Sequence, residues 1–288
     1  MKSLSVSFRS FAAALAVPAL LSGLLAGCAG GGFDLHPLAS HPGHDAASDL
    51  RVAESALTAG DTELAVTLFE RALKADPRSI GAQIGLGDVM YQNNDLPRAG
   101  VLYAQAAAAA PDDPRAQLGL ARVALRERRL DDAVARYGRL AAAYPDNPVA
   151  AEGLGTALDL QGRHDEAQAV YRTALGRHPE AQGVRNDLGL SLILAGQPRE
   201  GANVLLDIAA LSGSPAQARQ NLAFAYGVLG NDEAARRILL ADMPSASVDD
   251  NLRFYARVRA ALPAGGGGEA ARADAKAGER GTRGGADK

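Results

Sequence analysis

Three histidines and an aspartate lie close together near the amino terminus of this 288-residue chain, in the segment HPLASHPGHD. Imidazole nitrogens and carboxylate oxygens are common ligands of zinc and copper, which makes His36, His41, His44 and Asp45 the best metal-ligand candidates in the sequence. No predicted element fixes their geometry, because glycine and proline surround them, and a metal site needs ordered ligands. The sequence therefore favours a solvated linker, with no metal and no other cofactor.

Other motifs for catalysis are missing from the sequence. It has no glycine-rich loop followed by Lys and Ser or Thr, no His-Glu-x-x-His helix motif and no nucleophile elbow. The closely spaced glycines of GLGDVM and GLGTAL lie within helical patterns with no strand before them, so they are packing residues. With no paired acid and base either, the sequence predicts a protein that is not an enzyme.

The single cysteine, Cys28, follows a short apolar stretch. Lys2 and Arg9 precede the apolar residues 11–25, and small residues close the stretch, which is the order of a secretory signal peptide over residues 1–27. The stretch is short for a membrane-spanning helix. Leu-Ala-Gly-Cys resembles the lipobox of bacterial lipoproteins, which implies that a diacylglyceryl group is attached to Cys28. An ordinary cleaved signal with an incidental cysteine is the alternative.

A lipid on Cys28 would determine where the protein works. Several acyl chains on one residue give stable membrane attachment, because each buried methylene contributes about 0.8 kcal/mol. Ala29 follows the cysteine, whereas an aspartate there retains enterobacterial lipoproteins at the inner membrane. The resemblance therefore implies the outer membrane, with the protein on its periplasmic face. Residues 28–47 are rich in glycine, proline and histidine and are expected to form a flexible tether.

The composition of the rest excludes a nucleic-acid partner and predicts a disordered tail. The net charge is −3 and the chain has no tryptophan, so it lacks the basic, aromatic-rich surface of nucleic-acid binders. Residues 263–288 contain glycine, alanine and charges of both signs but no large apolar side chain. Such a segment cannot bury a core, and we expect it to be disordered.

Between these ends the sequence repeats with a period of 34 residues. A proline, an aromatic residue and a small residue each recur at this spacing: Pro77, Pro111, Pro145 and Pro179; Phe69, Tyr103, Tyr137 and Tyr171; Ala65, Ala99, Ala133 and Ala167. The alanine lets two helices approach, the ring fills the gap between units, and proline ends the second helix. The pattern resembles the tetratricopeptide repeat, a helix–turn–helix unit.

The sequence therefore predicts an all-α fold, a tetratricopeptide-repeat solenoid of about six helix pairs over residues 46–247. Six units exceed the three or so that a stable stack needs. A further helix over residues 248–262 is expected to cap the apolar end of the stack.

Stacked repeats of this type curve, and their first helices line the concave side, where partner proteins bind. Arg115, Arg122 and Arg126 share one face of the first helix of the third unit by helical spacing. They predict either a basic patch that receives an acidic or carboxyl-terminal peptide, or a solvated charged face.

Further along the same side, Asn186, Leu190, Ile193 and Phe224 are candidates for an apolar segment that binds a partner helix or strand. For Leu190 and Ile193, packing against the next unit is the favoured alternative. The sequence thus predicts a partner-binding groove of two chemically different parts.

The last two units and the cap resemble a narrower family. RNDLGLSLILAGQPREGANVLL, ARQNLAFAYGVLGNDEAARRIL and VDDNLRFYARVRA are similar to the carboxyl-terminal half of the TadD family, the tetratricopeptide lipoproteins of the tight-adherence (Flp) pilus assembly system. The resemblance implies a pilotin-like scaffold of the outer membrane that supports the pilus secretin by binding peptides. Of the family's functional positions, only the lipidated cysteine maps onto this sequence, at Cys28.

Two alternatives keep the same architecture. One is another periplasmic repeat lipoprotein, such as a type IV pilus pilotin or an outer-membrane-protein assembly factor. The other is an adaptor that recruits cell-wall hydrolases.

Overall fold

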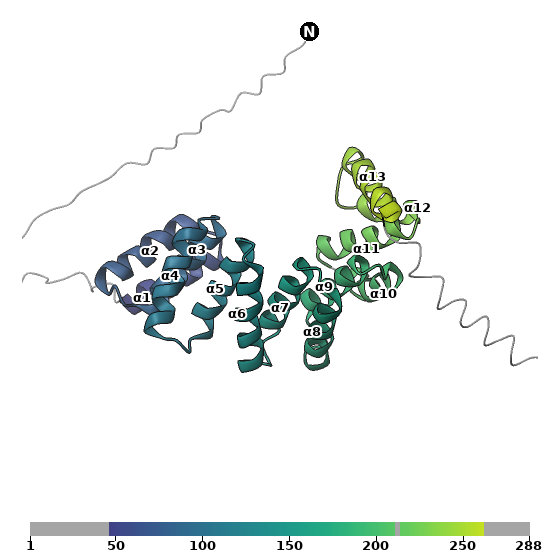
Figure 1. Ribbon diagram of the computed structural model, residues 1–288. Helices are drawn as coiled ribbons and strands as arrows, with labels where there is room; N and C mark the ends of the chain where they lie inside the picture. The colour runs from purple at the N-terminus through teal and green to yellow at the C-terminus, as the bar shows by residue number, and fades with distance from the viewer. Residues whose placement is uncertain (1–45, 211–213, 262–288) are drawn as a thin grey trace, which may run out of the picture. The chain divides into compact units, whose positions relative to one another are not determined.

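The computed structural model describes residues 46–210 and 214–261, and Figure 1 shows their helices in chain order. Cys28, the three histidines at 36, 41 and 44, and the expected tail lie outside the described residues. The described residues form thirteen helices and no strand. They are α1 (Ala46–Thr58), α2 (Thr62–Ala75), α3 (Ile80–Gln92), α4 (Leu96–Ala109), α5 (Pro114–Arg126), α6 (Leu130–Ala143), α7 (Pro148–Leu160), α8 (His164–Arg177), α9 (Gln182–Leu194), α10 (Pro198–Ala209), α11 (Ala216–Val228), α12 (Asp232–Leu239) and α13 (Ser245–Ala261).

Short polar side chains and prolines begin several of these helices. The Asp61 carboxylate accepts a hydrogen bond from the backbone N–H of Leu64 at 3.1 Å, which satisfies one of the free amides at the start of α2. Asn147 does the same for Val149 at the start of α7, whose first residue is Pro148. Proline suits that position because its missing N–H would have had no partner within the helix.

The turn inside each pair needs a left-handed backbone at one residue. Gly60, Gly162, Gly196 and Gly230 have φ between 77° and 86° there, and Asn94 and Arg128 have φ 61° at the equivalent places in the second and third pairs. Glycine and asparagine adopt this conformation at little cost, whereas a long side chain is strained by it. The third pair therefore carries local strain at Arg128.

A buried aromatic ring joins neighbouring pairs. Tyr103 on α4 has no exposed surface and lies between Gly87 on α3 and Gly119 on α5. A Cβ on Gly119 would lie 2.4 Å from the ring, and one on Gly87 would lie 2.8 Å from it. Both positions need glycine because the ring occupies the space of a side chain. Phe69, Tyr137 and Tyr171 are buried in the same way.

The stack curves toward its first helices. Each first helix, from α1 to α11, contacts the first helix of the next pair, whereas in the described residues successive second helices make no such contact. The first helices therefore line the concave, inner side. Helix α13 packs on α11 and α12, with the Tyr255 ring against Gly227. This arrangement confirms the predicted fold of six helix pairs and a capping helix.

None of the helices in the described stretches is long and apolar enough to cross a bilayer.

Candidate functional site

Two arginines of α5 stack on one tyrosine of α3 and form an arginine–tyrosine cluster on the inner side. The Cζ atoms of Arg122 and Arg126 lie 4.6 and 5.2 Å from the centroid of the Tyr91 ring. Arg122 also lies 3.5 Å from the Asp88 carboxylate, which accepts a hydrogen bond from the Tyr103 hydroxyl at 2.7 Å. The ring faces attract the guanidinium charges and hold both in place, while part of each remains exposed.

Arg115 does not join this cluster. Its Nη2 lies 2.7 Å from a carboxylate oxygen of Asp113, the residue that caps the start of α5. The hydrogen bond with Arg115 lowers the pKa of Asp113 and raises that of the arginine. The structure thus brings two of the three expected arginines together and ties the third to its own helix end. The role of all three in partner binding stays a prediction.

Two carboxyl groups face each other across α7 and α9 with no cation between them. Asp187 takes the place that Gly85, Gly119 and Gly153 hold in earlier pairs, and it is half-buried. Burial, and then the nearby Glu152, raise the pKa of Asp187 to about 7. Burial also raises the pKa of Glu152. In the described residues, neither carboxyl group forms an ion pair with Lys or Arg.

Asp159, next to this pair, is satisfied mainly by neutral donors. Its carboxylate accepts hydrogen bonds from the hydroxyls of Ser191 at 2.7 Å and Tyr171 at 3.1 Å. The Nδ1 atom of His164 lies 2.8 Å away on the same carboxylate. Ser191 is fully buried, so these bonds fix α7, α8 and α9 to one another. The inner side therefore changes from arginines on α5 to carboxyl groups on α7 and α9.

The residues predicted to form an apolar segment on α9 have both polar and apolar neighbours. Asn186 is 8% exposed; its side-chain amide donates to Asp187 at 3.2 Å and accepts from Asn221 at 2.9 Å. Ile193 is buried and belongs to the same apolar core cluster as Leu205, as the packing alternative expected. Leu190 is half-buried.

Phe224 joins an aromatic cluster at the end of the stack. Its ring centroid lies 5.1 Å from that of Tyr255 and 6.1 Å from that of Phe254, both on α13. Phe254 is 47% exposed, so the cluster has a free apolar edge. Sequence analysis did not identify Phe254, although two adjacent aromatic residues in a capping helix are a signal for it.

Asp88, Tyr91, Glu152 and Asp187 were also missed as site residues. The 34-residue frame contains the signal for one of them, because Asp88 stands one period before Arg122 and so lies on the neighbouring first helix. Within the described stretches, no group of three or more His, Cys, Asp or Glu side chains could hold a metal ion.

Helix pairs stacked in register, with a curved inner side of charged and aromatic residues, define an α-solenoid scaffold for binding other proteins. Sequence profiles of the tetratricopeptide repeat match residues 56–123, 118–182 and 153–214, which together cover more than half of the chain. The chain belongs to the tetratricopeptide-repeat family.

Two solved structures illustrate the shared fold. A tetratricopeptide repeat protein from Parabacteroides merdae superposes with a TM-score of 0.62 at 10% identity, over 74% of this chain and 85% of that one. A thermophilic repeat protein from Thermus thermophilus gives 0.56 at 20% identity, over 63% of this chain and 98% of that one. At these identities the likeness shows the fold alone. No curated protein matches the chain.

Proposed function

We propose that this protein is a lipid-anchored scaffold on the periplasmic face of the outer membrane that supports assembly of the Flp pilus. Its partner in this proposal is a protein of the pilus secretion apparatus, with the secretin as the first candidate. The observation that carries the proposal is a lipobox cysteine, Cys28, followed by a repeat array whose last two units and cap resemble the TadD family. Arrays of this family are generally non-catalytic scaffolds, in agreement with such a role.

The arginine–tyrosine cluster supports binding of an acidic segment of the partner. A guanidinium has five N–H donors. Arg126 uses one of them on Asn94 at 3.3 Å, and one guanidinium nitrogen of Arg122 lies 3.5 Å from the Asp88 carboxylate. Both therefore retain donors for a partner carboxylate, and stacking on Tyr91 reduces the entropy that they lose on binding.

The carboxyl groups of Glu152 and Asp187 support a fixed direction for the bound segment. An acidic residue placed over α7 and α9 would face uncompensated carboxyl groups, whereas the same residue over α5 faces guanidinium groups. Above about pH 7, where Asp187 is ionised, repulsion at one end and attraction at the other favour one orientation of an extended peptide.

Replacing Cys28 with Ala tests the membrane role. We expect the variant to leave the membrane fraction, and heat-resistant secretin multimers and surface pili to decrease. Ala26→Ser, which keeps a small residue in the lipobox, is the matched control and should behave as wild type. Unchanged multimers and piliation in the Cys28→Ala strain would contradict the pilus role, and a mature amino terminus without acyl groups in mass spectrometry would contradict the anchor.

Reversing the charge of Arg122 and Arg126 together tests the inner surface. The double Glu variant should lose co-purification of the secretin while its circular dichroism spectrum stays helical. Arg237→Glu is the control, because Arg237 is exposed on the second helix α12, away from the inner side. Equal recovery of the partner with both variants would show that this surface does not bind it.

A further inference from the structure

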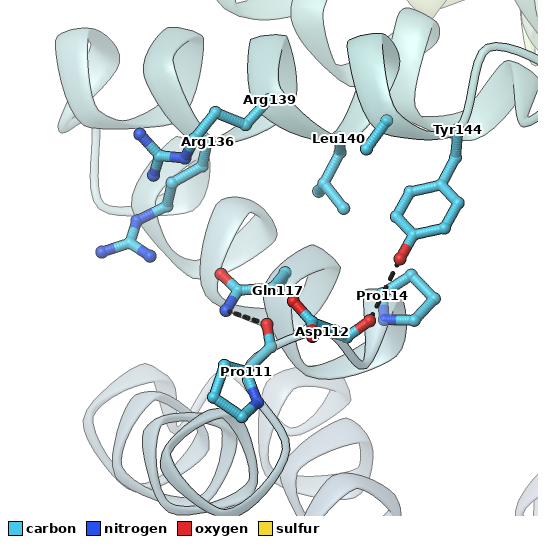
Figure 2. A pocket seen from close by; sticks show the side chains of 9 residues that line it. Pro111, Asp112, Pro114, Gln117, Arg136, Arg139, Leu140 and Tyr144 are labelled. Atoms are coloured by element: carbon cyan, nitrogen blue, oxygen red, sulfur yellow. Dashed lines mark hydrogen bonds between the residues drawn. The ribbon is translucent and has the colours of Figure 1, made fainter.

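A second polar site lies on α6, away from the arginine–tyrosine cluster. A pocket of about 370 Å³ opens between α6 and the residues that lead into α5. Figure 2 shows the guanidinium groups of Arg136 and Arg139 on the same side of this pocket, away from the Tyr144 ring. Leu140 and Pro114 form part of its apolar wall. The Tyr144 hydroxyl donates to the backbone oxygen of Asp112 at 3.0 Å, which holds the wall against the loop.

The first helix pair shows what an arginine at this place binds. Arg71 on α2 stands two 34-residue periods before Arg139, and its Nε donates to the Asp49 carboxylate on α1 at 2.7 Å. Asp49 is 4% exposed, so this carboxylate lies in the groove between the two helices. The residue two periods after Asp49 is Gln117, which lines the pocket. The third pair therefore keeps the arginine and lacks the carboxylate.

The guanidinium of Arg139 has no hydrogen-bond or ion-pair partner among the residues that the structure describes. No hydrogen bond joins Gln117 to Arg139; the Gln117 amide N–H donates instead to the backbone oxygen of Pro111 at 3.1 Å. Arg136 uses its Nε on Asp132 at 2.7 Å and keeps its outer nitrogens. Asp112 also lines the pocket but makes no ion pair with either arginine. Unused guanidinium donors thus meet an open, partly apolar space.

The equivalent place in the fourth pair lacks both arginines. A pocket of about 290 Å³ lies there, and Val170 and Thr173 stand one period after Arg136 and Arg139. The pair of arginines at these two positions is therefore specific to the third pair, whereas the fourth-pair pocket has Arg177 in its wall, whose Nη1 donates to the backbone oxygen of Pro145 at 3.4 Å.

We propose that the α6 pocket binds the carboxylate of an aspartate or glutamate side chain on a partner protein. The carboxylate takes the place that Asp49 has in the first pair and accepts hydrogen bonds from Arg139 and Arg136. The Tyr144 ring, Leu140 and Pro114 contact the apolar atoms of the same partner segment. Binding here is separate from the inner side and does not depend on the pilus role.

The test uses the full chain in detergent micelles, labelled with ¹⁵N-arginine so that each Nε–Hε group gives an NMR signal. The probe is N-acetyl-aspartate N-methylamide, which carries only a side-chain carboxylate. We expect it to shift the Arg139 signal with a dissociation constant on the order of 10 mM, since a single partly exposed ion pair is weak. The asparagine analogue, which has no carboxylate, should give no shift.

Two variants of the pocket make the test specific. Gln117→Asp supplies the carboxylate that the first pair has, so it should occupy Arg139 and weaken probe binding about fivefold or more. Asp112→Asn removes a competing negative charge and should strengthen binding about twofold. Arg139→Gln identifies the signal and should abolish the binding.

The proposal is wrong if the probe leaves the Arg139 signal unchanged at about five times the expected dissociation constant. Equal binding to wild type and to Gln117→Asp would also contradict it, since the internal carboxylate then fails to compete. N-acetylglycine carries only a terminal carboxylate; if it binds and the aspartate probe does not, the assignment to a side chain is wrong.

Discussion

The interface between the second and third helix pairs and that between the fourth and fifth each contain a buried tyrosine at the equivalent repeat position, but they differ in the charged residues around it. Tyr103 and Tyr171 are both buried, and the hydroxyl of each donates to a carboxylate, that of Asp88 at 2.7 Å and that of Asp159 at 3.1 Å. Beside Tyr103 the next first helix supplies Gly119. Beside Tyr171 it supplies Asp187 at the equivalent position.

The two interfaces also differ in the compensation of their carboxyl groups. Arg122 lies 3.5 Å from Asp88, so a cation balances the charge at the first interface. At the second interface, the hydroxyls of Ser191 and Tyr171 donate hydrogen bonds to Asp159. Burial and the nearby Glu152 disfavour the ionised form of Asp187 and raise its pKa to about 7. The 34-residue repeat therefore determines where side chains meet, but the residue at each meeting point decides whether a carboxyl group has a cation beside it.

The largest effect is expected when the glycine of the first interface is replaced. Gly119→Leu places a side chain where the Tyr103 ring already lies, so the free energy of unfolding should fall by about 3 kcal/mol. Gly138→Leu on α6 is the matched control, because no atom lies within 4 Å of a Cβ there. Urea unfolding measures both. An equal loss in the two variants would show that close packing at Tyr103 does not distinguish these sites.

Removal of the charge at the second interface should change the pH dependence of stability. Asp187 binds its proton more tightly when folded, with a pKa of about 7, than when unfolded, so wild-type stability should fall as pH rises from about 4 to 7. Asp187→Asn should remove this slope and be more stable than wild type by about 2 kcal/mol at pH 8. Asp146→Asn, at an exposed loop residue, should follow the wild-type curve. Parallel curves for wild type and Asp187→Asn would contradict the assignment.

A smaller gain is expected in the turn of the third pair. Arg128→Gly removes the strain of a long side chain at φ 61°, but it also adds conformational entropy to the unfolded chain. The net free energy of unfolding should rise by about 0.5–1 kcal/mol. The reverse change in the fourth pair, Gly162→Arg, should cost a similar amount at φ 77°. Thermal unfolding of the two variants gives the comparison. If Arg128→Gly destabilises the protein, the turn is not strained.

The smallest effect is expected at the arginine that compensates Asp88. Arg122→Met removes a guanidinium group that stacks on Tyr91 and lies 3.5 Å from Asp88; both contacts are partly exposed, so the free energy of unfolding should fall by about 0.5 kcal/mol at low salt. The loss should shrink in 1 M salt, where the Debye length is about 3 Å. The same loss at both salt concentrations would indicate packing and not charge as the cause.

The candidate site was predictable from the sequence only in outline. Helical spacing placed Arg122 and Arg126 on one face of α5, and the structure stacks both on Tyr91. The same spacing included Arg115, which pairs instead with Asp113 because that residue caps the same helix. Spacing along one helix describes directions from its axis and carries no information on which neighbour a flexible side chain meets.

By itself, the sequence determined the fold of this protein. Proline, ring and small residue recur every 34 residues, and each acts on its own pair and the next, so a local pattern is enough to specify a stack. Only the tertiary structure decided that Arg122 lies beside Asp88, that the pKa of Asp187 rises to about 7, and that Arg139 lacks a carboxylate partner among the described residues. These properties depend on distances between different helices and on burial, which a one-dimensional period does not contain.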